Sequence, residues 1–163
     1  MLLYLTTQNS NMKTLHIFRG LPGSGKTTAA KELASSLDDA TIYSTDKYWD
    51  LYHKSEFIAC KTRKAHQWNQ DKVKKAMLSC KQNIIVDNTN LDWSEISPYQ
   101  TYARVYGYQT KIYEPQTSWW ISKDIELLSE KNTHGVPIEK LVKMLARYEP
   151  LESIQNTLEK FQN

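Results

Sequence analysis

Short apolar runs alternate along the chain with longer stretches in which apolar residues recur every three or four positions. Uninterrupted apolar runs are typical of strands whose two faces are both covered. The alternation therefore predicts an α/β fold with three layers, in which helices cover both faces of a doubly wound, mainly parallel sheet. The predicted strands are residues 15–18, 41–44, 83–86 and 109–113.

Helical periodicity fills the intervals between these strands. Asp92, with Glu95 three residues later, resembles a capping box and should open a helix that Gly107 closes. Near the carboxyl terminus, Pro137 lies where another helix would begin, and Pro150 would end it. The predicted helices cover residues 28–37, 61–79, 92–106, 117–129, 138–149 and a last segment reaching 161. One buried stripe is expected at the helically spaced positions Ile138, Leu141, Val142 and Leu145.

The segment Gly20–Thr27 satisfies the phosphate-binding pattern GxxxxGK[ST] between a predicted strand and a predicted helix. Glycines let backbone N–H groups approach phosphate oxygens, and the helix start adds the positive end of its dipole. Lys26 is expected to bridge the β- and γ-phosphates, and Thr27 to bind Mg²⁺ through its hydroxyl. No guanine-specific TKxD motif is present, so the expected nucleotide is ATP. Its expected contacts are Gly20, Leu21, Pro22, Gly23, Ser24, Gly25, Lys26, Thr27 and Thr28.

Two carboxylates follow predicted strands at the edge where the phosphate-binding loop should lie. Asp46 comes just after the second strand and is expected to be the general base that accepts the proton of an acceptor hydroxyl. The alternative is that Asp46 caps a helix starting at Lys47. Asp87 ends the third strand and is expected to hold Mg²⁺ through water, or else to serve as a turn carboxylate.

The acceptor side is predicted from polar and aromatic residues near these carboxylates. Tyr48 and Trp49 would stack a base of a single-stranded acceptor, or pack in the core. The segment from Lys54 to Lys81 carries a net charge of +6 and includes Arg63, which suits either a nucleic acid or a solvated helix face. Further side chains would hydrogen-bond the acceptor or cap the turn, namely Asn88, Thr89 and Asn90.

A loop between two predicted helices, near residues 130–137, has the character of a lid. Lys131 is expected to close over the transferring phosphoryl group, with His134 behind it. The alternative for Lys131 is an ordinary helix C-terminal lysine that compensates the dipole.

Taken in order, these motifs resemble the P-loop 5′-hydroxyl polynucleotide kinases, both the phage-type enzyme and the kinase-like domains of eukaryotic ubiquitin-ligase-binding proteins. The resemblance covers about residues 13–150 and implies an adenylate-kinase-like sheet, ATP as donor, Asp46 as base and a lid around Lys131. It also adds Arg147 to the nucleotide-binding residues. The phage-type enzyme has arginine where this chain has Trp49, and arginine is usual at the lid position of Lys131. The matching segments are Arg19–Thr27, Ser44–Tyr48, Val86–Asn90, Pro98–Tyr99, Glu114–Pro115, Asn132 with His134–Pro137, and Arg147–Glu149.

The sequence thus predicts an N-terminal extension over residues 1–12 and a single P-loop kinase domain over 13–163. The predicted function is Mg²⁺- and ATP-dependent phosphorylation of a hydroxyl, with the 5′ end of RNA or DNA as first choice. The alternatives are a small-metabolite or nucleoside kinase and a non-catalytic ATP-binding module. The first residues lack the architecture of a secretory signal, no apolar run approaches the ~20 residues of a membrane span, and a cytoplasmic protein is expected. The expected partners are ATP and a nucleic-acid 5′ end, and the sequence does not identify a protein partner.

Overall fold

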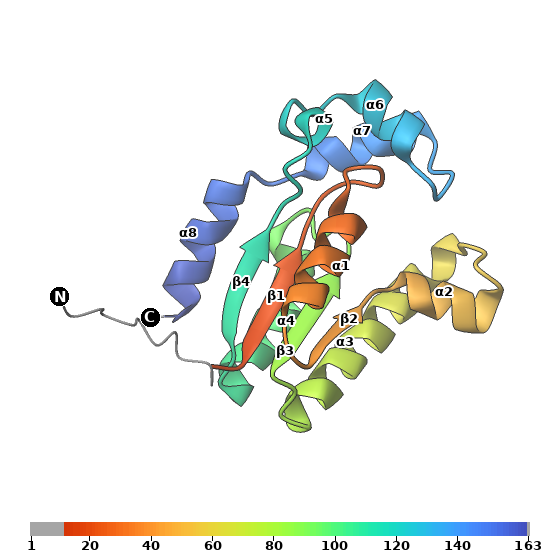
Figure 1. The fold of residues 1–163 in the computed structure, drawn as a ribbon. Helices are drawn as coiled ribbons and strands as arrows, with labels where there is room; N and C mark the ends of the chain where they lie inside the picture. Colours follow the sequence, from red (N-terminus) through yellow and green to blue (C-terminus); the bar gives the residue numbers. More distant parts are fainter. Residues whose placement is uncertain (1–11, 163) are drawn as a thin grey trace.

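A parallel sheet of four strands forms the centre of the computed structural model, which describes residues 12–162. Most of the predicted N-terminal extension, residues 1–11, therefore lies outside the described residues. The strand order is β2-β3-β1-β4, and every neighbouring pair is parallel (Figure 1). The four predicted strands are confirmed to within one residue at each end: β1 Thr14–Phe18, β2 Ala40–Tyr43, β3 Asn83–Asp87 and β4 Gln109–Tyr113.

The register aligns the carboxyl ends of β3, β1 and β4. Phe18, the last residue of β1, lies opposite Asp87 of β3 and Tyr113 of β4. Loops that follow these strands must therefore leave the sheet side by side. This edge is where a ligand is expected in a doubly wound α/β sheet.

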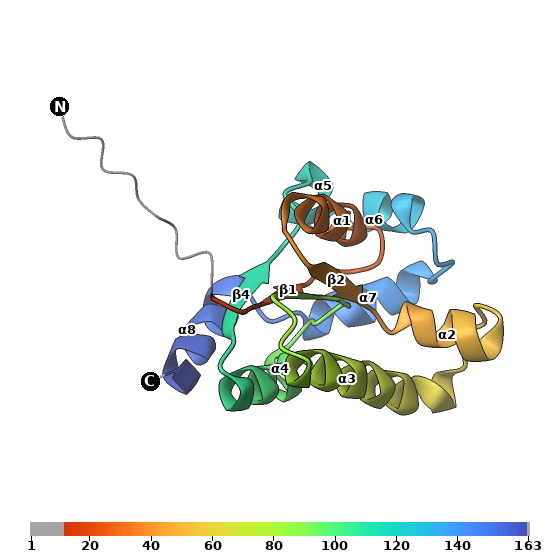
Figure 2. The same ribbon diagram turned by 60° about the horizontal axis from the view of Figure 1, so that its bottom comes forward.

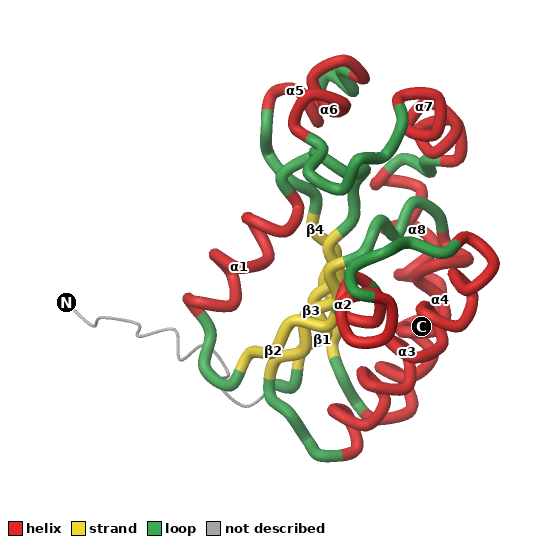
Figure 3. Tube along the Cα trace, turned by 90° about the vertical axis from the view of Figure 1, so that its right-hand side faces the viewer, coloured by secondary structure: helices red, strands yellow, loops and turns green. Residues whose placement is uncertain are grey.

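Helices cover both faces of the sheet, which confirms the predicted three-layer architecture (Figures 2 and 3). On one face α1 (Lys26–Ser36) packs Ala30 against Phe18 and Ile85. On the other, α3 (Thr62–Leu78) and α4 (Trp93–Tyr106) enclose a larger core with Leu15 and Ile84. The last helix, α8 (Leu151–Gln162), lies against α4 and buries Ile154 in that core. The alternation of short strands and amphipathic helices is thus sufficient to define the layers.

The capping prediction for α4 is confirmed. The side chain of Asp92 accepts a hydrogen bond from the backbone N–H of Glu95, and Gly107 ends the helix at φ 71°. Glycine tolerates this left-handed conformation without steric cost.

The single helix predicted over 117–129 is wrong, because two helices occupy this stretch. They are α5 (Ser118–Ile121) and α6 (Ile125–Lys131), separated by Lys123 at φ 55°. Thr117 caps the first through Trp120 N–H and Asp124 caps the second through Leu127 N–H. Side-chain caps compete with a continuous helix, and two of them within eight residues divide it.

The predicted buried stripe on α7 (Ile138–Arg147) is only partly correct. Leu141 is fully buried and packs in a cluster with Leu128 of α6, whereas Ile138 and Val142 are 37% and 52% exposed. The helix lies above the end of the sheet with α5 and α6, so no layer covers its second flank (Figure 1). We call this group of three helices, α5 to α7, the cap.

Candidate active site

The glycine-rich loop runs from the end of β1 to α1, and α1 begins at Lys26 directly after Gly25 at φ 93°. Two side chains of the cap support the loop from outside. Trp119 Nε1 donates to the carbonyl of Gly23 at 2.9 Å, and Thr117 Oγ1 donates to that of Ser24 at 2.9 Å. These two bonds use loop carbonyls and therefore hold the loop without occupying its backbone N–H groups, which are the groups that bind phosphate in such loops.

Close packing on the cap explains why Gly23 must be glycine. Its φ is +82°, and a Cβ added there would collide with the backbone carbonyl of Leu128 in α6. The loop and the cap are therefore one packed unit.

Lys26, Thr27 and Asp87 meet at the start of α1. Thr27 Oγ1 donates to Asp87 Oδ2 at 2.8 Å, while Lys26 Nζ lies 3.8 Å from Asp87 Oδ1. That second oxygen is buried and makes no hydrogen bond among the described residues. A hydroxyl and a buried carboxylate with an unused lone pair are the oxygen ligands that Mg²⁺ prefers, with water completing its octahedron. The residues present therefore fit this ion.

A cavity of about 220 Å³ opens above the loop. Lys131, the last residue of α6, lies on its rim with Nζ 4.7 Å from the centre of the Trp119 ring. Of the loop residues predicted to contact ATP, all but Gly20 line this cavity, and four residues of α5, α6 and the loop after α6 join them. The lining residues are Leu21, Pro22, Gly23, Ser24, Gly25, Lys26, Thr27, Thr28, Trp119, Lys131, Thr133 and His134.

Asp46 is the first residue of α2 (Asp46–His53), which follows β2. Thr45, and not Asp46, occupies the N-cap position, so the Asp46 carboxylate is not used as a cap. Its Oδ2 lies 3.8 Å from Nε2 of His134, and both side chains are about half exposed. Asp46 is not among the residues that line the cavity above the loop, but His134 is, so this imidazole connects the Asp46 carboxylate to the cavity.

The polar turn after β3 holds this arrangement together. Asn88 Oδ1 accepts from both the N–H and the hydroxyl of Thr45, at 2.9 and 3.0 Å, and so fixes the residue before Asp46. Thr89 Oγ1 donates to Glu95, and the buried Asn90 donates to the carbonyl of Phe18 at 2.7 Å. The side chains of this turn thus make internal hydrogen bonds that position the loop and Asp46.

The remaining predicted residues lie farther from the cavity. Tyr48 and Trp49 are 4% and 8% exposed and pack against Ala65 of α3. Arg63 is exposed on α3 and does not line the cavity.

Arg147, predicted from the resemblance to bind the nucleotide, lies at the end of α7 and is not among the residues that line the cavity. It donates to Asp92 at 2.8 Å and to Glu95 at 3.0 Å. The hydrogen bond to Asp92 raises the pKa of Arg147.

Sequence reasoning missed the role of Arg19, which directly precedes the loop and is fully buried. Its guanidinium lies 3.1 Å from the carboxylate of Glu114 and donates to the carbonyls of Leu91 and Glu149, each at 2.6 Å. Tyr148 completes the group by donating to Glu114 at 2.8 Å. Burial lowers the pKa of Arg19, and Glu114 opposes that shift. A charged residue at the end of a buried strand is the only sequence signal for this network.

A second residue that the sequence analysis did not single out is Trp119, which donates to the loop. No feature of its sequence neighbourhood distinguishes it from Trp120, which is fully buried. In residues 12–162, no helix combines the length and the apolarity that crossing a membrane requires.

A glycine-rich loop between β1 and α1, with lysine and threonine facing a carboxylate at the end of β3, defines a P-loop fold of the kinase type. Residues 15–151 match the AAA-domain family, and the chain belongs to it.

Two curated relatives and one solved structure illustrate the similarity. The chain is 38% identical over 140 residues to human NEDD4-binding protein 2, covering 86% of this chain and 8% of that protein. It is 31% identical over 137 residues to mouse 2′,3′-cyclic-nucleotide 3′-phosphodiesterase, covering 81% and 30%. A chain of the Pnkp1/Rnl/Hen1 RNA repair complex has the same fold, with a TM-score of 0.63 at 18% identity, covering 94% of this chain and 48% of that one. This chain therefore spans less than a third of either curated relative.

Proposed function

We propose that the protein is an ATP-dependent kinase that transfers the γ-phosphate to a hydroxyl, with the 5′-hydroxyl of RNA or DNA as its acceptor. The observation that carries this proposal is the position of His134. It lines the phosphate-binding cavity and lies 3.8 Å from Asp46, so a carboxylate stands beside the place where a terminal phosphate would be held.

The residues divide the work of transfer. Loop N–H groups and Lys26 hold the phosphates, and Asp46 accepts the proton of the attacking hydroxyl. The acceptor oxygen forms a bond to the γ-phosphorus while the bond to the β-bridging oxygen breaks, and ADP leaves. Lys131 neutralises charge on the transferring group from the rim. When bound by Thr27 and Asp87, Mg²⁺ would neutralise phosphate charge.

The acceptor is assigned from charge and from similarity. The basic segment between Lys54 and Lys81 includes α3 and the residues on either side of it, and α3 contacts α2, the helix that begins with Asp46. Such a surface suits a polyanion. The similar fold in an RNA repair complex agrees with a nucleic-acid acceptor.

One observation favours a small-molecule acceptor. Trp49, at the position where the phage-type enzyme has arginine, is buried and offers no charge to an acceptor phosphate. A nucleoside or another neutral hydroxyl compound would need no such charge. A non-catalytic ATP-binding module is the remaining alternative.

An acceptor panel distinguishes these functions. The protein, labelled ATP and Mg²⁺ are incubated with RNA and DNA oligonucleotides of one sequence, each with either a 5′-hydroxyl or a 5′-phosphate, and with free nucleosides. We expect label to enter only 5′-hydroxyl oligonucleotides. Label in nucleosides alone would replace the proposal with a small-molecule kinase, and ATP binding without transfer to any acceptor would replace it with a binding module.

A further inference from the structure

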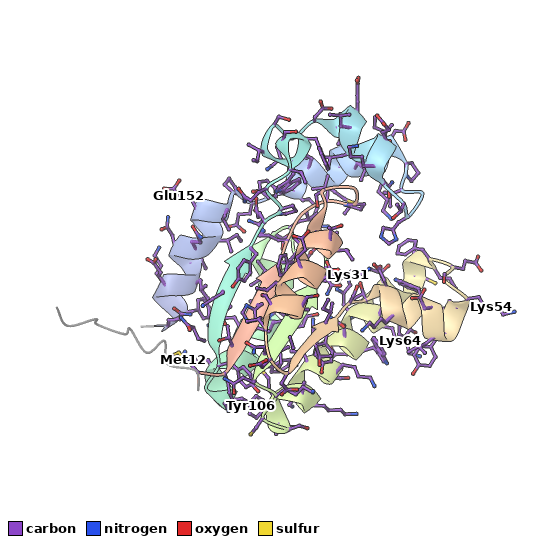
Figure 4. The ribbon with its side chains drawn as sticks, viewed as in Figure 1. Met12, Lys31, Lys54, Lys64, Tyr106 and Glu152 are labelled. Carbon is purple, nitrogen blue, oxygen red and sulfur yellow. The ribbon has the colours of Figure 1, made fainter. Side chains whose placement is uncertain are left out.

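A second hollow, of about 590 Å³, lies between α2 and α3 and is larger than the cavity above the phosphate loop. We call it the α2–α3 groove. Lys64 lies in the angle between the two helices, with Lys54 at the far end of α2 (Figure 4). The residues of this groove that matter for binding are Tyr48, Tyr52, His53, Lys61, Lys64 and Trp68.

Aromatic rings form the apolar part of this groove. Tyr52 is 59% exposed, and its ring centre lies 5.0 Å from that of Tyr48 and 6.3 Å from that of Trp68. Tyr48 is buried and therefore fixes the position of the exposed ring. A large exposed aromatic ring on a rigid support is a surface on which a nucleobase can stack.

Cations surround these rings. Lys61 and Lys64 line the groove, and Lys64 is exposed. One acid, Asp71, also lines the groove and accepts a hydrogen bond from Gln67 at 3.0 Å. Lys54 and Arg63 add positive charge near this end of α3, whereas Lys81, beyond the other end, pairs with Asp39 at 2.9 Å. The positive charge near the groove is complementary to a phosphate backbone.

We propose that the α2–α3 groove binds the nucleotides that follow the reacting 5′ end of a single-stranded RNA or DNA. This inference rests on the proposed function for its account of the 5′ end. Tyr48 follows Asp46 by two residues on one helix, about 3 Å along its axis, so the groove begins within a turn of the base. The Asp46 side chain lies next to His134 of the lid loop, whereas the groove lies between α2 and α3. A bound nucleic-acid strand would therefore cross α2 on its way from Asp46 to the groove. Only a single strand exposes base faces to the rings.

Exposed side chains allow a test that spares the fold. Tyr52→Ala removes the stacking ring, Tyr52→Phe keeps it, and Lys160→Ala on the distant α8 is the control for loss of a surface charge. The readout is kcat/KM for a 5′-hydroxyl ten-mer relative to a 5′-hydroxyl dinucleotide.

We expect the wild type to have a higher kcat/KM for the ten-mer than for the dinucleotide. In Tyr52→Ala the ratio of the two kcat/KM values should fall about tenfold, the usual contribution of one stacked base. Tyr52→Phe and Lys160→Ala should keep it. A wild type with no length preference, or an unchanged preference in Tyr52→Ala, overturns the groove while leaving the proposed kinase function intact.

A direct binding measurement separates the α2–α3 groove proposal from the proposed kinase function. Fluorescence anisotropy of a labelled single-stranded ten-mer requires no phosphoryl transfer. Lys64→Ala should weaken binding and reduce the salt slope of log K by about 0.7, the value for one phosphate contact on a single strand. If the wild type transfers no phosphate but binds the ten-mer in a Tyr52-dependent way, the groove stands and the kinase function fails. Absence of binding to any single strand overturns the groove.

Discussion

Asp87 shows how single residues carry the chemistry of this site. It is buried at the end of β3 and accepts a hydrogen bond from Thr27, while its second oxygen lies 3.8 Å from Lys26 Nζ and makes no hydrogen bond within residues 12–162. A buried carboxylate is costly unless it is paired, so this geometry is stable when cations approach it. The arrangement is built for a charged ligand.

Lys131 supplies the test at this scale. We expect Lys131→Ala to lower kcat by about 10²-fold, the effect of removing one group that stabilises transition-state charge, with little change in ATP affinity. Lys131→Arg should restore the rate, because guanidinium binds phosphate oxygens in a fork. Rapid-quench transfer assays with measured ATP Kd values provide the readout, and an unchanged kcat in Lys131→Ala would exclude a role for its charge.

At the scale of elements, α4 shows which parts of the fold were predictable. Its capping residue, its closing glycine and the strands on either side could be predicted because they depend on local signals. The break between α5 and α6 was missed because it depends on Lys123 adopting φ 55°, a conformation that its side chain does not encode. The exposed flank of α7 was missed because periodicity reports an apolar face but not whether another layer covers it.

Asp92, the N-cap residue of α4, predicts a pH-dependent contribution to stability. Burial raises the pKa of Asp92, but hydrogen bonds from Ser94 and Arg147 outweigh it and leave the pKa below its usual value of 3.8. A depressed folded-state pKa means that this stabilisation is fully present above pH 3.8 and is lost as the pH falls through the lowered value.

Two substitutions separate the N-cap hydrogen bond of Asp92 from its ion pair with Arg147. Asp92→Ala removes both the N-cap and the pair with Arg147, and the N-cap alone should account for about 1 kcal/mol of the lost free energy of unfolding at pH 7. Asp92→Asn keeps a capping oxygen and loses only the partly exposed pair with Arg147, so it should cost about 0.2–1 kcal/mol at pH 7. Urea unfolding from pH 7 to pH 2.5 measures the free energy of unfolding of both proteins. We expect the difference between wild type and Asp92→Asn to shrink below pH 4. A difference that grows there would contradict the lowered pKa of Asp92.

At the scale of the whole molecule, Arg19 joins parts of the chain that are distant in sequence. Its contacts reach Leu91 after β3, Glu114 after β4 and Glu149 between α7 and α8. The phosphate-binding loop was predictable from eight consecutive residues, but this network spans 130 residues and required the fold. The network thus ties the end of α7 to the carboxyl ends of the strands.

The central claim is that a triphosphate held by the loop presents its terminal group to the Asp46 carboxylate. The most direct measurement is single-turnover transfer from ATP to a 5′-hydroxyl oligonucleotide by the wild type and by Asp46→Asn, at ATP concentrations that saturate both. We predict unchanged ATP affinity and a transfer rate lower by about 10²- to 10⁴-fold, the contribution of a general base. Equal transfer rates in the two proteins would contradict the account.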